Sequence, residues 1–312
     1  MNNYYFTVFT PSYNRRHTLT RLYKSLEEQS FKNFEWLILD DGSDDGTKEL
    51  IEGLKRNATF PIRYKWVTNR GKHKVKNIGV KEAHGLFFFN IDSDDWLEPH
   101  TLERFKYHYE SIPEESRSQF SGVAGLTRFA GKGVTGKAGD LNGIKNPEDI
   151  MDTDMISIRE KYKVRGEKCG CHLTSVMRKF PWPEFDNEKF SPEALIWRRM
   201  AKEKYLVRYV NEIYRNQEIQ KGGLSDPKML LKRIVYNPKG EVLRQNEEIP
   251  IVATFQKRIR AVISYSRCSF HARYSLRRMV THCNNKKLLV VGIPVGFLIY
   301  LNDKRKLGKE HI

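Results

Sequence analysis

The sequence lacks the features that mark several common protein classes. It contains no G-x-G-x-x-G fingerprint and no G-x-x-x-x-G-K-[ST] loop, so neither a dinucleotide-binding fold nor a P-loop is indicated. Its first ten residues hold no basic segment and no long apolar core, so no signal peptide is predicted. Only four cysteines occur in 312 residues, without a regular spacing. We therefore expect a protein of the reducing cytoplasm.

Two of the cysteines are close enough together to raise the question of zinc. Cys169-Gly170-Cys171 is followed directly by His172. A structural zinc site needs four ligands, usually from two cysteine or histidine pairs, and no matching second pair follows. We therefore interpret Cys169 and Cys171 as ordinary thiols in a strand or turn.

Acidic residues are scarce, above all toward the C-terminus. The chain has 38 Asp and Glu against 55 Lys and Arg, a net charge of +17. Residues 256–312 contain 13 basic and 2 acidic residues, which gives 13 − 2 = +11. Such a surplus predicts polyanionic neighbours: nucleic acid, anionic lipid or phosphorylated substrates. Because no DNA- or RNA-binding motif appears, we do not expect nucleic acid.

No apolar run reaches the roughly 20 residues that a membrane-spanning helix needs. The longest is 288–301, which is interrupted by Pro294 and flanked by lysine and arginine. A basic amphipathic helical pattern precedes it. We expect an interfacial or re-entrant segment on an anionic leaflet, with a kink at Pro294. A buried core or dimer helix is the alternative.

The first 110 residues alternate predicted strands and helices. Apolar, β-branched or aromatic runs predict strands at 4–10, 34–39, 62–67 and 86–91, and apolar residues at helical spacing fill the intervals. This alternation predicts an α/β fold with a doubly wound, mostly parallel sheet flanked by helices. Further strands are expected at 121–129 and 205–210. The Gly- and Lys-rich stretch 130–143 is either a connecting loop or one that closes over a ligand.

Polar clusters follow three of these strands, at 10–14, 40–45 and 92–95. The carboxyl ends of parallel strands share one sheet edge, where such folds bind ligands. Asp92 and Asp94 are two residues apart, so they share a side in extended backbone. Paired carboxylates suit Mg²⁺ or Mn²⁺, although Asp and Ser also form plain turns.

Taken in order, three motifs resemble those of the family 2 glycosyltransferases. They are Thr10-Pro11-Ser12-Tyr13-Asn14, Asp40-Asp41-Gly42-Ser43-Asp44-Asp45-Gly46-Thr47 and Asp92-Ser93-Asp94-Asp95. Each motif is weak alone, but their order and spacing are specific, and the resemblance covers roughly residues 4–225. It implies a GT-A catalytic domain over 1–225. The remaining 226–312 would form a basic helical extension that associates with a membrane.

The resemblance also implies roles for single residues. Thr10, Tyr13 and Asp41 would line the base and ribose pocket, with Asp41 bonded to the base. Asn77 matches a recurring asparagine ahead of the fourth strand. Asp92 would face the ribose and the metal shell, and Asp94 would bind Mg²⁺ or Mn²⁺ directly. Some of the basic residues before Asn77 would touch the diphosphate or remain solvated: Arg70, Lys72, His73, Lys74 and Lys76. The stretch 220–225 resembles a segment that folds over the diphosphate.

Glu193 is the candidate general base. The family has an acidic residue, often Glu-Asp, at the start of a downstream helix, and here the pair is Glu193-Ala194. We expect Ser191 to cap this helix. The competing carboxylates lie just upstream, at Glu184, Asp186 and Glu188. Trp197, one helical turn on, is either an acceptor platform or a core residue.

The resemblance as a whole implies an inverting transfer of a sugar from a nucleotide-diphosphate donor, with a UDP-sugar favoured. The acceptor would be a hydroxyl of a glycan or lipid-linked substrate in cell-surface polysaccharide synthesis, at the cytoplasmic face of the membrane. Two alternatives stay open. One is nucleotidyl transfer to sugar phosphates, and the other is a non-catalytic protein that binds polyanions or membranes.

Overall fold

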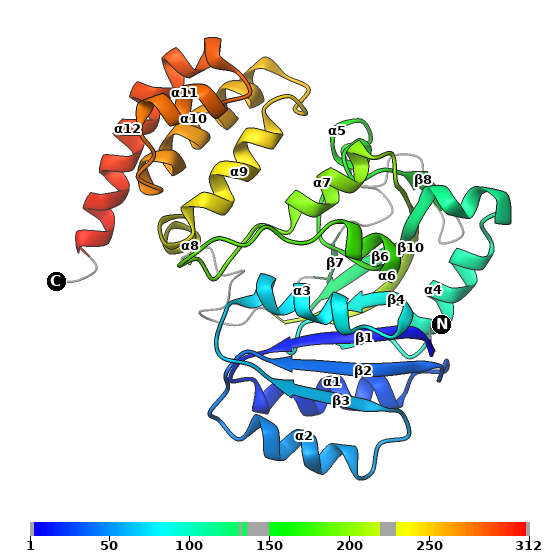
Figure 1. Ribbon diagram of the computed structural model, residues 1–312. Coiled ribbons are helices and arrows are strands. Elements are labelled where there is room, and N and C mark those ends of the chain that lie inside the picture. Colours follow the sequence, from blue (N-terminus) through cyan, green and yellow to red (C-terminus); the bar gives the residue numbers. More distant parts are fainter. Residues whose placement is uncertain (1–2, 131–132, 136–149, 219–228, 310–312) are drawn as a thin grey trace. The chain divides into compact units, whose positions relative to one another are not determined.

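The computed structural model describes residues 3–130, 133–135, 150–218 and 229–309, and the chain divides into two compact units (Figure 1). The first unit comprises Met1–Pro181 and Ile196–Ile219, and the second comprises Trp182–Leu195 and Gln220–Ile312. The second junction lies near the boundary expected at 225. No sequence pattern indicates that residues 182–195 belong with the C-terminal unit. Most of the stretch 130–143, and all of 220–225, lie outside the described residues.

The first unit is organised around one sheet. Its strands are β1 (Tyr4–Ser12), β2 (Phe34–Asp40), β3 (Ile62–Trp66), β4 (Gly85–Asn90), β5 (Trp96–Leu97), β6 (Phe120–Phe129), β7 (Gly133–Thr135), β8 (Ile150–Thr153), β9 (Lys168–Leu173) and β10 (Leu206–Gln217). Its helices are α1 (Arg16–Glu27), α2 (Thr47–Lys55), α3 (Lys72–Glu82), α4 (Thr101–Glu110), a 3₁₀ helix (Glu114–Gln119), α5 (Ser157–Glu160), α6 (Thr174–Lys179) and α7 (Ala194–Lys202), whose first two residues belong to the second unit.

The sheet confirms the predicted α/β class. Its order is β3-β2-β1-β4-β9-β6-β10-β5, with β7 beside β6 and β8 beside β10. Strands β1 to β4 are mutually parallel, as the alternating pattern predicts, and β6 and β10 are also parallel. Strand β9 runs antiparallel between β4 and β6 and joins the two parallel parts.

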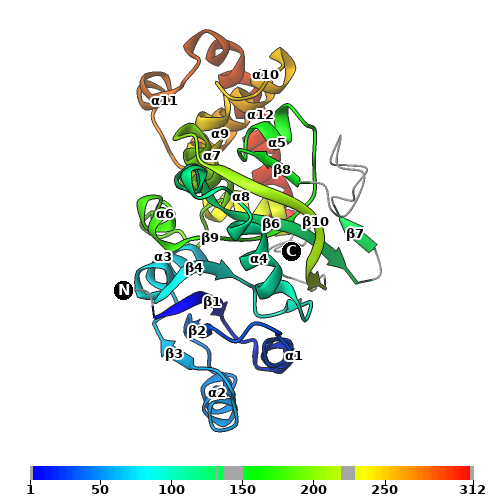
Figure 2. The ribbon, with the colours of Figure 1, turned by 90° about the vertical axis from the view of Figure 1, so that its right-hand side faces the viewer.

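Alternate residues of β1 face opposite layers of helices. Phe6 and Val8 belong to a core that includes apolar residues of α1, α2 and α4. Phe9, on the other face, lies directly beneath Gly79 of α3, where an added Cβ would come within 2.3 Å of its ring. Figure 2 shows α1 and α3 on opposite sides of these strands. Parallel strands covered on both faces are buried along their length, as β2 is from Phe34 to Asp40.

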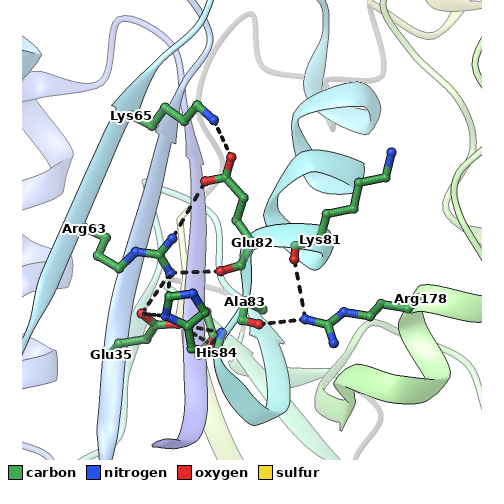
Figure 3. Close-up of polar contacts among 9 residues, drawn as sticks. Glu35, Arg63, Lys65, Lys81, Glu82, Ala83, His84 and Arg178 are labelled. Carbon is green, nitrogen blue, oxygen red and sulfur yellow. Dashed lines mark hydrogen bonds and ion pairs between the residues drawn. The ribbon is translucent and has the colours of Figure 1, made fainter. Parts of the chain in front are cut away.

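A buried ion cluster fixes the C-terminal end of α3 to the sheet (Figure 3). Glu35 of β2 is fully buried, and it accepts hydrogen bonds from the backbone N–H of His84 at 2.9 Å and from Arg63 at 3.1 Å. Arg63 also donates to the carbonyl of Glu82 at 2.8 Å, and Arg178 donates to that of Ala83 at 2.8 Å. These donors satisfy carbonyls that the helix end leaves open. The opposite end of α3 meets the polar loops.

The second unit is helical, as expected of the C-terminal extension. Its helices are α8 (Leu230–Tyr236), α9 (Pro238–Glu248), α10 (Phe255–His271), α11 (Leu276–His282) and α12 (Lys286–Lys309). Val262 and Tyr265 of α10 are fully buried in its core, together with Met279 of α11. Helix α12 continues through Pro294 without ending. Within the described ranges, no helix combines the length and the apolar character that crossing a bilayer requires.

Candidate active site

The three polar loops meet at one edge of the sheet. Ser12 and Asp40, the last residues of β1 and β2, are register partners, and Asn90 at the end of β4 pairs with Phe9. The backbone N–H of Asp41 donates to the carbonyl of Ser12 at 2.7 Å. The predicted gathering of these loops at the carboxyl ends of the parallel strands is therefore present.

Asp41 is held rigidly at this edge. It is 6% exposed, and its two carboxylate oxygens accept the backbone N–H groups of Arg70 at 2.6 Å and Gly71 at 2.9 Å. Gly71 has a φ of +99°, a conformation that side-chain-bearing residues rarely adopt. The loop before α3 can therefore turn its N–H groups onto Asp41, which fixes the direction in which this carboxylate presents its remaining lone pairs.

Tyr13 and Thr10 lie at the end of β1 in different surroundings. The Tyr13 ring is 51% exposed, so its face is open to a planar group. Thr10 is fully buried, and its hydroxyl accepts a hydrogen bond from the Trp36 indole at 2.9 Å. The role expected of Thr10 in the base pocket stays a prediction. Alternation along β1 turns Thr10 into the interior, where it supports the strand end.

Asp92 faces the first turns of α3. Lys72 donates to its Oδ2 at 2.7 Å, and Lys76 follows one helical turn later. Burial alone would raise the pKa of Asp92, but Lys72 and Lys76 hold that pKa well below its usual range. Asp92 is thus a carboxylate at ordinary pH. Its other oxygen, Oδ1, is buried and has no hydrogen-bond partner among the described residues.

The backbone at Asp94 is held by Arg21, a residue that the sequence did not single out. Arg21 of α1 donates to the carbonyl of Asp94 at 2.6 Å and lies over the Trp96 ring, 4.0 Å from its centre. It also pairs with Glu218, just beyond β10, at 2.8 Å. The Asp94 side chain itself is partly exposed. Arg21 therefore fixes the backbone of the loop, while the Asp94 carboxylate stays accessible.

Asp95 points into the protein instead. It is fully buried, and Arg215 of β10 lies 3.2 Å from its Oδ2. Arg215 also contacts Glu167 at 3.0 Å. Burial raises the pKa of Asp95, and Arg215 opposes that shift. Asp95 and Arg215 thus support the loop from inside the protein, whereas Asp92 and Asp94 are both partly exposed.

The carboxylates of this edge suit a divalent cation that shares its ligands with a substrate. Asp94 is partly exposed, and the Oδ1 of Asp92 is a hard oxygen that no donor among the described residues contacts. Within the part of the chain that is described, no group of three or more acidic, histidine or cysteine side chains could enclose a metal ion. Mg²⁺ and Mn²⁺ accept such partial protein shells and complete them with water and phosphate oxygens.

Asn77 and Glu193 complete the predicted set. Asn77 is 6% exposed in the second turn of α3, one turn after His73. Glu193 is exposed and stands directly before α7, which begins at Ala194. The expected cap Ser191 therefore lies too early to cap this helix, and its buried hydroxyl has no hydrogen-bond partner among the described residues. Glu193 belongs to the second unit, so its approach to the sheet edge stays a prediction.

Of the three carboxylates that are alternatives to Glu193 as the general base, one stabilises a helix N-terminus. Glu188 is 4% exposed, and its carboxylate accepts the backbone N–H groups of Lys239 at 2.7 Å and Gly240 at 3.1 Å. It therefore satisfies the N-terminus of α9. Glu184 and Asp186 are exposed, as Glu193 is.

The cysteine pair and the tryptophan singled out in the sequence lie in and beside β9. Cys169 and Cys171 are buried free thiols in this strand, as expected, and burial raises the pKa of Cys169 to about 12. The neighbouring His172 stacks on Trp197, with 4.6 Å between ring centres. Burial lowers the pKa of His172 to about 4, so its ring is neutral at ordinary pH. Trp197 is half-buried against it.

Residues 7–116 match the model of "Glycosyl transferase family 2". A Campylobacter jejuni protein described as "GalNAc(5)-diNAcBac-PP-undecaprenol beta-1,3-glucosyltransferase" is 25% identical over 67% of this chain and 63% of its own length. The Staphylococcus aureus "Poly(ribitol-phosphate) beta-N-acetylglucosaminyltransferase TarS" is 32% identical over 31% of this chain. That match spans only 18% of TarS.

Solved structures extend the likeness to the whole fold. S. aureus TarS 1–349 in complex with UDP-GlcNAc aligns over 98% of this chain and 92% of its own, with a TM-score of 0.57 at 16% identity. The mannosyltransferase PcManGT from Pyrobaculum calidifontis, in complex with GDP-Man and Mn²⁺, aligns over 96% and 88%, with a TM-score of 0.54 at 12% identity. These findings place a glycosyl transferase family 2 domain at residues 7–116, which include Asp41, Asp92 and Asp94, and they show that the chain has the fold of these glycosyltransferase structures.

Proposed function

We propose that this protein is an inverting glycosyltransferase that moves a sugar from a nucleotide-diphosphate donor to a hydroxyl of a glycan or lipid-linked acceptor. The observation that carries this proposal is the fixed carboxylate of Asp41 at the same sheet edge as Asp92 and Asp94. Relatives named for transfer to an undecaprenol-linked glycan and to poly(ribitol-phosphate) support an acceptor used in surface polysaccharide synthesis.

In this proposal Asp41 accepts a hydrogen bond from the base, and Tyr13 offers its exposed ring to a planar group of the donor. A carboxylate pinned by two backbone donors loses little conformational freedom when it binds, which favours recognition. Uracil presents a suitable N–H to Asp41, so a UDP-sugar is our first choice. Asn77 completes the nucleotide-binding set.

Asp94, with Asp92 beside it, would hold Mg²⁺ or Mn²⁺. The bound cation would supply Lewis-acid stabilisation of the charge that grows on the departing diphosphate. Lys72 and Lys76 add positive charge at the same edge and keep Asp92 ionised. Glu193 would remove the proton from the attacking acceptor hydroxyl, on the side opposite the departing group, which gives inversion.

The proposed reaction can be tested by its products. Purified full-length protein is incubated with UDP-, GDP- and dTDP-sugars, with Mn²⁺, Mg²⁺ or EDTA, and the released nucleotide is identified. We expect a nucleoside diphosphate from one donor class, at least about tenfold faster with metal than with EDTA. Release of pyrophosphate from UTP and a sugar 1-phosphate, assayed in parallel, would instead indicate nucleotidyl transfer. Absence of both donor turnover and donor binding across the panel would contradict the proposal.

The position of the protein in the cell belongs to the same proposal. A lipid-linked acceptor would require the enzyme to work beside a bilayer, and we propose a peripheral position on the cytoplasmic face. The basic C-terminal unit is the part expected to carry this attachment.

A further inference from the structure

One side of helix α12 packs against the rest of the C-terminal unit. Leu289 is 1% exposed, and Gly292 and Gly296 lie against α10. A Cβ added at Gly292 would come within 2.6 Å of Val262, and one at Gly296 within 2.6 Å of Ser266. Glycines at this spacing let the two helices approach closely, so α12 cannot turn about its axis without losing this packing.

The only acidic residue of α12 also faces inward. Asp303 is 3% exposed and accepts hydrogen bonds from Arg267 of α10 at 2.5 Å and 2.8 Å. His271 approaches the same carboxylate at 3.0 Å. The negative charge of Asp303 is therefore neutralised inside the unit, and the outer side of α12 carries no acid.

The outer side is apolar and exposed. Val290 is 75% exposed, Leu298 65% and Leu301 45%. Positions 290, 294, 297, 298 and 301 follow helical spacing, so they lie along one side of the helix. We call this surface the α12 face, and it comprises Val290, Val291, Pro294, Phe297, Leu298 and Leu301, all of them exposed.

Exposed cations stand at both ends of the α12 face. Lys286 and Lys287 precede it, and Lys304, Arg305 and Lys306 follow it. A helix rises 1.5 Å per residue, so about 25 Å separates Lys287 from Lys304. An apolar band between two basic ends is the pattern of a helix that lies in a membrane interface.

We propose that the α12 face docks flat on the surface of an anionic lipid bilayer. The apolar side chains would enter the acyl boundary, and the five cations would meet lipid phosphates. A second copy of the chain fits this face poorly, because either orientation of two paired helices brings cations beside cations. A re-entrant segment is excluded by the packing of Gly292 and Gly296 on α10. This surface would bring the enzyme to its lipid-linked acceptor, a role that rests on the proposed function.

Vesicle co-sedimentation of the full-length protein tests membrane docking without any nucleotide-sugar donor. Its outcome is therefore independent of the transferase assay. We expect binding to phosphatidylcholine vesicles with about 30% phosphatidylglycerol, and at least about tenfold weaker binding to pure phosphatidylcholine. Raising NaCl from about 0.1 M to about 0.5 M should weaken the binding. The variant Val290→Asp/Leu298→Asp should lose binding about tenfold or more, because charge opposes entry into the interface.

The matched control is Leu230→Asp/Tyr236→Asp, which places the same charges on exposed residues of α8 in the same unit. It should bind vesicles as the unchanged protein does. Because all four side chains are exposed, both variants should keep the thermal transition of the parent. Equal loss in both variants would overturn the proposal, as would failure of the parent protein to bind anionic vesicles. So would a dimer in solution that only Val290→Asp/Leu298→Asp dissociates.

Discussion

Replacing Glu193 by glutamine is expected to lower turnover by about 10²- to 10⁴-fold, the range that a positioned general base contributes. Glutamine keeps the size of the side chain but cannot take the acceptor proton. Glu193 is exposed and precedes α7, so the change lies outside the buried core. Binding of the donor should stay within about threefold of the parent value, because the base acts on the acceptor.

The matched control for this change is Glu184→Gln, an exposed carboxylate in the same segment. Nucleoside diphosphate release is measured for both variants, and donor affinity is measured by calorimetry. The control should keep turnover within about threefold of the parent. Parent-like turnover of Glu193→Gln, or equal loss in the two variants, would remove Glu193 from the mechanism. The second result would point to the segment and not to this residue.

Replacing Asp94 by asparagine is expected to lower turnover about 10³-fold. A Lewis acid stabilises the charge on the departing diphosphate by several kcal/mol, and each 1.36 kcal/mol of activation free energy changes the rate tenfold. The amide removes the negative charge from a partly exposed acid of the loop. Arg21 holds that loop through the Asp94 carbonyl, so its backbone position should survive the change. The thermal transition without metal should therefore match that of the parent.

Affinity for Mn²⁺, measured by electron paramagnetic resonance with UDP present, should fall at least about tenfold in Asp94→Asn. The exposed Asp44 belongs to the neighbouring loop, and Asp44→Asn serves as the matched control that should keep both metal affinity and turnover. Unchanged Mn²⁺ affinity in Asp94→Asn would assign the cation to other ligands.

The strands and their polar ends could be predicted because local pattern determines them. Largely apolar runs such as 34–39, in which Glu35 is the one charged residue, are typical of strands that helices cover on both faces. Asp92 directly follows another such run at 86–91. Strand β9 was harder to place. Its short stretch around Cys169 shows no clear alternation, and its antiparallel pairing depends on β4 and β6, which are distant in sequence.

The residues that hold the site in place could not be predicted, because their contacts join parts of the chain that are distant in sequence. Arg21 looks like a solvated residue of an amphipathic helix until Trp96 and Asp94 are placed beside it. Arg215 lies beyond the strand predicted at 205–210, so its place in the sheet was not predicted. The burial of Thr10 was not predicted, because a family motif does not show which way a single side chain turns. The outer side of α12 was recognised as apolar, but only the packing of Gly292 and Gly296 shows which side stays exposed.

The most direct test is a crystal structure of the protein with its nucleotide-sugar donor and Mn²⁺, with the metal located by its anomalous signal. We predict one Mn²⁺ between the Asp94 carboxylate and the donor diphosphate, with the base bonded to Asp41. A donor bound away from this sheet edge, or a metal held without Asp94, would contradict the account.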